Sequence, residues 1–155
     1  MIIIITALCL GGFFAWLLIE NRYAPKIHNI VLISIDTCRA DYLSCYGYPK
    51  NTTPNIDAFA DQATRFENVV SPAPITLPAH SSMLTGRIPP SHGVRNNTFF
   101  RLDSSIPTLA KILPDEFTST AVVSSFVLDR QFGLAQGFNT YHDRFQEDHR
   151  SRYSN

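Results

Sequence analysis

The chain has 155 residues, with 13 basic and 13 acidic side chains and a formal net charge of zero. This balance removes the electrostatic reason to expect nucleic acid as a partner. Hydrophobic residues make up 45% and aromatic residues 12% of the sequence, which excludes a disordered chain. Length alone allows one folded domain of modest size after a short N-terminal segment.

Residues 1–20 predict a transmembrane anchor or a signal segment. The run 2–19 is apolar and uncharged, and at about 1.5 Å per residue it approaches the ~30 Å hydrocarbon thickness of a bilayer. Trp16 lies near one end, where an aromatic ring suits the membrane interface. No basic region precedes the run and no clear small-residue cleavage site follows it. We therefore expect an uncleaved single-pass anchor, with residues 21–28 as a juxtamembrane linker.

The first half of the remaining chain predicts two strands and a helix. Residues 29–35 are almost wholly apolar and β-branched, as is typical of a strand buried on both faces of a parallel sheet. Residues 54–63 carry apolar side chains at helical spacing, with Thr53 as the cap and Pro54 in the first turn. Residues 66–70 have the composition of a further short strand.

The second half of the chain continues the alternation of predicted strands and helices. Pro78 is an early helix residue that places Thr76 at the helix start, and Gly86 closes this helix. Ser104 or Ser105 caps another helix. Residues 120–124 predict a further buried strand. The order of strands and helices predicts the α/β class, with a mostly parallel sheet.

Asp36 directly follows the first predicted strand. Ligands in open α/β sheets bind beyond the carboxyl ends of strands, so this carboxylate is well sited to hold a hard cation or zinc. The alternative is a turn aspartate that caps the next segment. Asp41 is either a second carboxylate of the same site or a surface partner of Arg39.

Thr76 is the candidate nucleophile. A helix N-terminus offers unpaired N–H groups and partial positive charge, which stabilise a phosphate or sulfate ester. A threonine hydroxyl at this position needs a base or a metal to react as the alkoxide. His80 lies four residues on, where it would contact the leaving group or a bound oxyanion. The alternative is that Thr76 is an N-cap and His80 a surface residue. Residues 91–97 are either donors to an anion or an ordinary polar loop.

Together these segments resemble the N-terminal part of the sulfatase and alkaline-phosphatase superfamily. The matching blocks are residues 29–48, 53–57, 76–87, 92–94 and 123–138. Their order and spacing make the resemblance specific to the superfamily. It implies that residues 29–155 are the N-terminal portion of a truncated, alkaline-phosphatase-like sandwich.

The resemblance also implies roles for individual residues. Asp36 corresponds to the first metal-binding carboxylate, and Thr37 stands where sulfatases usually have a second aspartate. Thr76 falls at the cysteine or serine that sulfatases convert to formylglycine. His80 replaces the arginine of that motif, and Arg87 ends the matching Leu-Thr-Gly-Arg segment, which makes it a further catalytic candidate.

Threonine cannot be converted to formylglycine, so this part of the sequence is more similar to other branches of the superfamily. The pattern Thr-x-Pro-x-His at 76–80 is similar to nucleotide pyrophosphatases and phosphodiesterases, which use a metal-bound threonine. Residues 52–55 resemble membrane-anchored phosphoglycerol and phosphoethanolamine transferases, which work outside the membrane. Arg22 and Lys26 alone would keep their flank inside, but this resemblance favours an extracytoplasmic domain.

The sequence therefore predicts a sulfatase-like, metal-dependent hydrolase of sulfate or phosphate esters. Asp36 and Thr76 would bind a divalent cation (calcium, zinc or manganese), with Thr76, His80 and Arg87 catalytic. The expected partners are the ester substrate and a membrane. The alternatives are a phosphoglycerol- or phosphoethanolamine-type transferase and a non-catalytic fragment.

Overall fold

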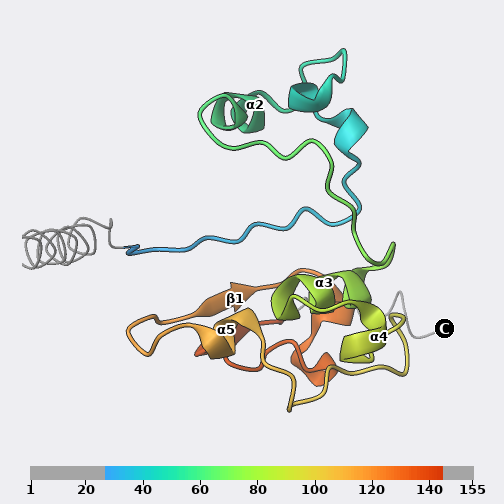
Figure 1. Ribbon diagram of the computed structural model, residues 1–155, viewed down its shortest axis with the longest axis vertical. Coiled ribbons are helices and arrows are strands. Elements are labelled where there is room, and N and C mark those ends of the chain that lie inside the picture. The colour runs from blue at the N-terminus through green and yellow to red at the C-terminus, as the bar shows by residue number, and fades with distance from the viewer. Residues whose placement is uncertain (1–26, 145–155) are drawn as a thin grey trace, which may run out of the picture. The chain divides into compact units, whose positions relative to one another are not determined.

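The computed structural model describes residues 27–144, which are drawn in colour in Figure 1. The chain divides into two units, Met1–Ile35 and Asp36–Asn155. The predicted anchor at residues 1–20 lies outside the described residues. Within residues 27–144, no helix combines the length and apolarity needed to cross a bilayer.

Residues 27–35 form no strand, so the prediction of a buried strand at 29–35 is wrong. Val31 and Ile33 are each 79% exposed. A β-branched run becomes a strand only where a neighbouring strand supplies hydrogen bonds and packing, and residues 29–35 belong to no strand pair in the described part of the chain. The strand predicted at 66–70 is wrong for the same reason, and Val70 is 88% exposed.

The second unit begins with two short 3-10 helices and one α-helix. They are η1 (Ala40–Tyr42), η2 (Ser44–Tyr46) and α2 (Pro54–Ala60). Helix α2 confirms the predicted helix, although it ends earlier than expected. Thr53 is its N-cap, but the hydroxyl donates to Asp57 Oδ1 (3.1 Å) instead of capping a backbone N–H. The same carboxylate oxygen accepts the Cys45 N–H (2.9 Å), which ties α2 to η2.

Three further helices follow: α3 (Thr76–Thr85), α4 (Pro89–His92) and α5 (Leu109–Ile112). Helix α3 starts at Thr76 as the sequence predicts, and it ends at Gly86, whose φ of 65° is the left-handed conformation that favours glycine. Helix α4 was not predicted. Helix α5 starts later than expected, because Thr108 is its N-cap in place of a serine.

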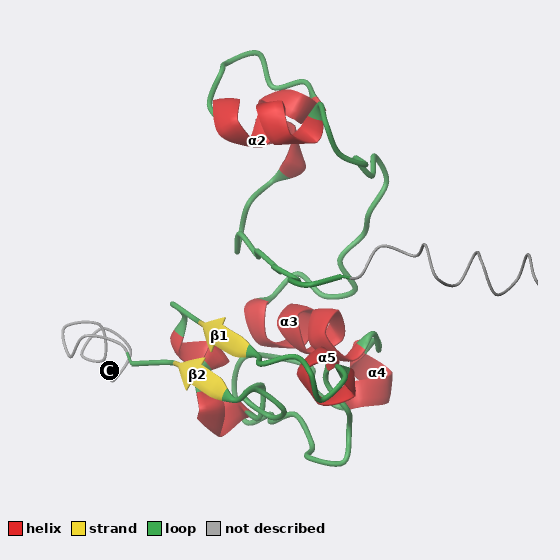
Figure 2. Ribbon diagram, turned by 90° about the vertical axis from the view of Figure 1, so that its left-hand side faces the viewer, coloured by secondary structure: helices red, strands yellow, loops and turns green. Residues whose placement is uncertain are grey.

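A small parallel sheet confirms the α/β class (Figure 2). Strand β1 (Thr120–Val122) pairs in parallel with β2 (Thr140–His142), with Ala121 opposite Tyr141. The connection between them contains η3 (Phe126–Leu128) and η4 (Arg130–Phe132). Strand β1 confirms the strand predicted at 120–124, but its side chains are exposed or half-buried instead of buried on both faces.

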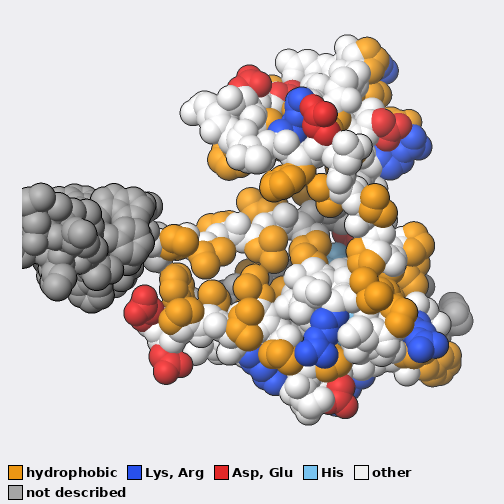
Figure 3. All heavy atoms as spheres, in the orientation of Figure 1, with side chains coloured by type: hydrophobic (Ala, Val, Ile, Leu, Met, Phe, Trp, Pro, Cys, Tyr) orange, Lys and Arg blue, Asp and Glu red, His pale blue; other side chains and the backbone are white. Residues whose placement is uncertain are grey.

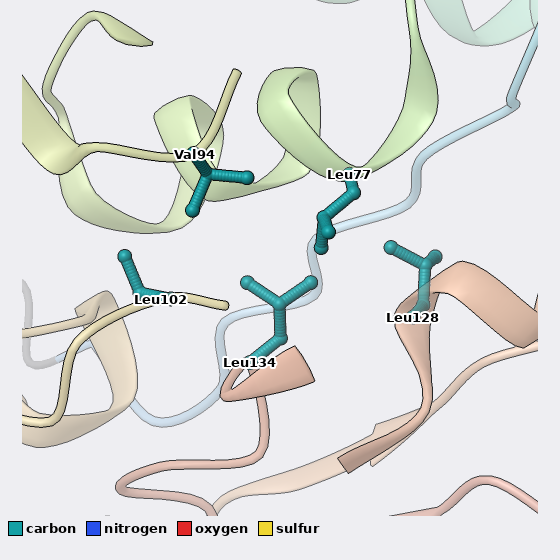
Figure 4. Packing of buried hydrophobic residues seen from close by; sticks show 5 residues of the cluster. All are labelled: Leu77, Val94, Leu102, Leu128 and Leu134. Carbon is teal, nitrogen blue, oxygen red and sulfur yellow. The ribbon is translucent and has the colours of Figure 1, made fainter. Parts of the chain in front are cut away.

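Five side chains form the buried core of the second unit, and they point toward one another in Figure 4. They are Leu77, Val94, Leu102, Leu128 and Leu134, each at most 7% exposed. Burying such a side chain contributes about 1.5–3 kcal/mol. Leu77 is the second residue of α3, so the core fixes the start of that helix. Many other apolar side chains remain at the surface, as the hydrophobic colouring in Figure 3 shows.

An ion pair between Arg130 and Asp143 joins the η3–η4 connection to the end of β2. Asp143, 6% exposed, accepts hydrogen bonds from the Arg130 backbone N–H (3.0 Å) and from its Nε and Nη2 (both 2.8 Å). These side-chain bonds lower the pKa of Asp143 to about 2. Tyr141 donates its hydroxyl to Leu128 O (2.6 Å), and burial raises its pKa to about 12. The η3–η4 connection is thereby fixed to β2.

Candidate active site at the start of helix α3

Thr76 and Asp36 are in direct contact. The Thr76 hydroxyl donates a hydrogen bond to Asp36 Oδ2 at 3.0 Å, across 40 positions of sequence. Asp36 is exposed and Thr76 is half-buried. The structure therefore brings together the two residues that the sequence assigned to a metal, and a ligand in solvent can reach both oxygens.

Asp36 is held in a strained turn. The next residue, Thr37, has a φ of 56°, a left-handed conformation that is a genuine outlier for a β-branched residue. Such strain costs on the order of 1–3 kcal/mol and is found mostly at functional sites. This turn directs Asp36 toward Thr76.

The start of α3 donates a hydrogen bond to a distant loop. Leu77 N–H donates to Asn97 Oδ1 at 2.9 Å, and Pro78, in the same turn, has no N–H to satisfy. The N-cap residue Ile75 makes no side-chain capping bond. In the sequence Asn97 is only part of a polar segment, because a capping residue 20 positions downstream leaves no local pattern.

His80 lies one helical turn beyond Thr76 and contacts it. Its Nδ1 is 2.8 Å from Thr76 O. A carbonyl oxygen only accepts, so Nδ1 carries the proton in this contact. In the neutral ring Nε2 is then the basic nitrogen.

Arg87 is not brought to the other candidates. It follows the C-cap Gly86 and is exposed. Helix α3 has ten residues, so its two ends are about 15 Å apart along the axis. Thr76 and Arg87 lie at opposite ends of this helix.

His92 is a buried link between α3 and α4. It is 2% exposed, and its Nδ1 accepts the Val94 N–H (3.1 Å). Nε2 therefore carries the proton and donates to Ser82 Oγ (2.9 Å). Burial lowers the pKa of His92 below its ordinary 6.5. This geometry makes His92 a packing residue and not an exposed donor to an anion.

The protein is expected to lose stability below pH 6.5 because of His92. The unfolded chain takes up a proton near pH 6.5 that the folded chain, with its lowered pKa, does not. The loss from this group is at most about 1.4 kcal/mol per pH unit. Urea melts at pH 7.5 and 5.5 measure it. His92→Gln, which does not titrate, should show a smaller loss; an equal loss in both proteins would contradict this assignment.

The oxygen atoms of Asp36 and Thr76 supply part of what a hard cation needs as ligands. A carboxylate and a hydroxyl are oxygen donors of the kind that calcium prefers, whereas structural zinc sites favour histidine and cysteine. Across residues 27–144, no cluster of three or more His, Cys, Asp or Glu side chains is placed to hold a metal. Asp41 does not join Asp36, since it pairs with Arg39 at 2.5 Å, which confirms the surface-partner interpretation.

The amino-acid sequence is similar to those of known sulfatases. Residues 28–155 match the family model described as Sulfatase. An ulvan-active sulfatase of Formosa agariphila is 35% identical over 111 residues, which is 72% of this chain and 22% of that protein. Human N-acetylgalactosamine-6-sulfatase is 30% identical over 132 residues, which is 80% of this chain and 25% of that protein.

A third similar protein, human arylsulfatase A, is 41% identical over 66 residues, which is 43% of this chain and 13% of its own length. The chain thus spans a quarter or less of the length of these curated relatives. No solved structure is similar enough to this chain to count as a match.

Proposed function

Because this chain belongs to the sulfatase family, we propose that it carries the nucleophile-bearing part of a metal-dependent sulfuric or phosphoric ester hydrolase. The observation that carries the proposal is the 3.0 Å contact between Thr76 Oγ1 and Asp36 Oδ2 at the start of α3. The hydroxyl and the carboxylate come from segments that both match the family model. The whole enzyme completes its site with groups outside residues 27–144, within an alkaline-phosphatase-like sandwich.

Asp36 and Thr76 are the residues that would hold the cation. A bound divalent cation, for which these oxygens favour calcium or manganese over zinc, supplies charge neutralisation at the ester and favours the threonine alkoxide. Asp36 accepts the hydrogen bond that aims Thr76 Oγ1, and it takes up the hydroxyl proton as the nucleophile reacts.

Thr76 Oγ1 forms a bond to sulfur or phosphorus while the bond to the leaving alcohol oxygen breaks. The leaving oxygen takes a proton, and water later hydrolyses the threonine ester and releases the inorganic anion. The Nδ1–H bond to Thr76 O orients the His80 ring. Its basic Nε2 takes a proton from the water that hydrolyses the threonine ester and gives this proton to the leaving alcohol oxygen in the next turnover. Because Arg87 lies at the far end of α3, it has no step in this mechanism.

Sulfate esters are the first substrate class to test. The similar proteins include an ulvan-active sulfatase and an N-acetylgalactosamine-6-sulfatase, and these names refer to sulfate-ester chemistry. Threonine at position 76 keeps phosphate esters in the proposal, because a metal-activated hydroxyl attacks either centre. We also propose that residues 1–20 anchor the chain in a membrane with this domain outside, which the uncharged run 2–19 supports.

The experiment is a substrate screen with the full-length protein. A chromogenic aryl sulfate and a chromogenic phosphodiester are assayed with calcium, manganese or zinc, and again after chelation. We expect turnover of the sulfate ester that chelation abolishes and added cation restores. Turnover that is unaffected by chelation would contradict metal dependence. Absence of turnover of both esters, with metal shown to bind, would contradict the hydrolase proposal.

A further inference from the structure

We propose that Asn97 is a positioning residue that fixes the direction of the Thr76 side chain; this inference rests on the proposed function of Thr76. Asn97 Oδ1 accepts the Leu77 N–H at 2.9 Å. That N–H belongs to the peptide unit that joins Thr76 to Leu77. The contact therefore acts on the backbone of the candidate nucleophile and not on its hydroxyl.

The Thr76–Leu77 peptide unit is held at both of its polar atoms. Its N–H donates to Asn97, and its carbonyl oxygen accepts from His80 Nδ1 at 2.8 Å. Because a peptide unit is planar, two side chains on opposite polar atoms fix the orientation of the whole plane. The plane in turn fixes the backbone at Thr76, from which Oγ1 points toward Asp36.

Asn97 is itself held in place. Val94, three residues earlier, is fully buried against Leu77 in the core cluster. Asn96 Oδ1 accepts hydrogen bonds from Thr98 N (2.8 Å) and Thr98 Oγ1 (3.2 Å), which shapes a tight turn around position 97. The loop thus presents the Asn97 amide to α3 from a packed base, as a positioning group requires.

The contact also replaces a local cap. The first N–H groups of a helix have no partner inside the helix, and the N-cap Ile75 carries no side-chain acceptor. Leu77 is 0% exposed, so water does not readily replace Asn97. Removing the amide leaves this N–H unsatisfied and frees the start of α3 to shift.

The test uses Asn97→Ala and Asn97→Asp in the full-length protein. We expect Asn97→Ala to lower kcat by about 10- to 100-fold, with KM within about twofold, because small displacements of a reacting group have effects of this size. The Leu77 amide should exchange with solvent about tenfold faster, as expected when one hydrogen bond is lost. Asn97→Asp keeps the acceptor and should recover both the protection and most of kcat.

Asn96→Asp is the matched control, since the carboxylate can accept both of the bonds from Thr98. We expect it to leave kcat and Leu77 exchange within about twofold, because no bond from Leu77 is lost. Unchanged Leu77 exchange in Asn97→Ala would overturn the inference, as would unchanged kcat despite faster exchange. Thr76→Ala separates the two proposals. If Thr76→Ala keeps its activity, the proposed function fails. If Thr76→Ala loses activity but Asn97→Ala keeps the kcat of the wild type, this inference alone fails.

Discussion

Thr76→Ala lowers kcat for ester hydrolysis on the order of 10³-fold or more, because it removes the atom that forms the covalent bond. The Asp36 carboxylate and the start of α3 remain, so substrate affinity changes less than kcat. Steady-state kinetics on the aryl sulfate, with folding checked by thermal melting, measure the effect.

Two variants control for this prediction. Thr76→Ser keeps the hydroxyl and its bond to Asp36, and it should retain activity within about tenfold of the wild type. Thr85→Ala makes the same substitution at the other end of α3, where the hydroxyl donates to Ser81 O and accepts the Arg87 backbone N–H (3.3 Å). It should leave kcat unchanged. Equal losses in Thr85→Ala and Thr76→Ala would mean that helix stability, and not a nucleophile, explains the result.

Asp36→Asn weakens cation binding by roughly 10³-fold, because a full charge near the ion contributes about 4 kcal/mol at the effective dielectric of a protein surface. The amide oxygen still accepts the hydrogen bond from Thr76, so the variant separates charge from geometry. Titration calorimetry with calcium and manganese measures the affinity, and the activity should fall in parallel.

Asp41→Asn is the matched control for Asp36→Asn. Asp41 is also exposed, lies five residues later and pairs with Arg39 (2.5 Å). Its loss should leave cation affinity within about twofold, because exposed ion pairs contribute little. If the two variants weaken the cation equally, general surface charge and not a specific ligand is responsible.

Helices α2 and α3 were predictable because their signals are local. Pro54 at the first position of α2 and Gly86 at the end of α3 are visible in the sequence and act as expected. Of the predicted strands, only the one at 120–124 is present, and those at 29–35 and 66–70 are not. Strand formation is harder to predict because pairing depends on distant segments. The apolar run 29–35 has the composition of a strand but forms no strand pair among residues 27–144, whereas β2, a short polar strand, carries no clear pattern.

The residues of the candidate site could also be predicted only in part. Asp36 and Thr76, which the family resemblance marks, are in contact, although the strand predicted before Asp36 is absent. Asn97 was missed because it contacts α3 only after the chain has passed through α4 and turned back. Arg87 ends a segment that matches the family motif, and only the length of α3 shows its separation from Thr76.

The most direct measurement is a crystal structure of the full-length protein grown with manganese, in which the anomalous signal locates the ion. The account predicts one ion with Asp36 Oδ2 and Thr76 Oγ1 both in its coordination shell, at about 2.0–2.6 Å for a hard cation. A manganese ion bound elsewhere, with the hydroxyl and carboxylate still joined only by their hydrogen bond, would contradict it.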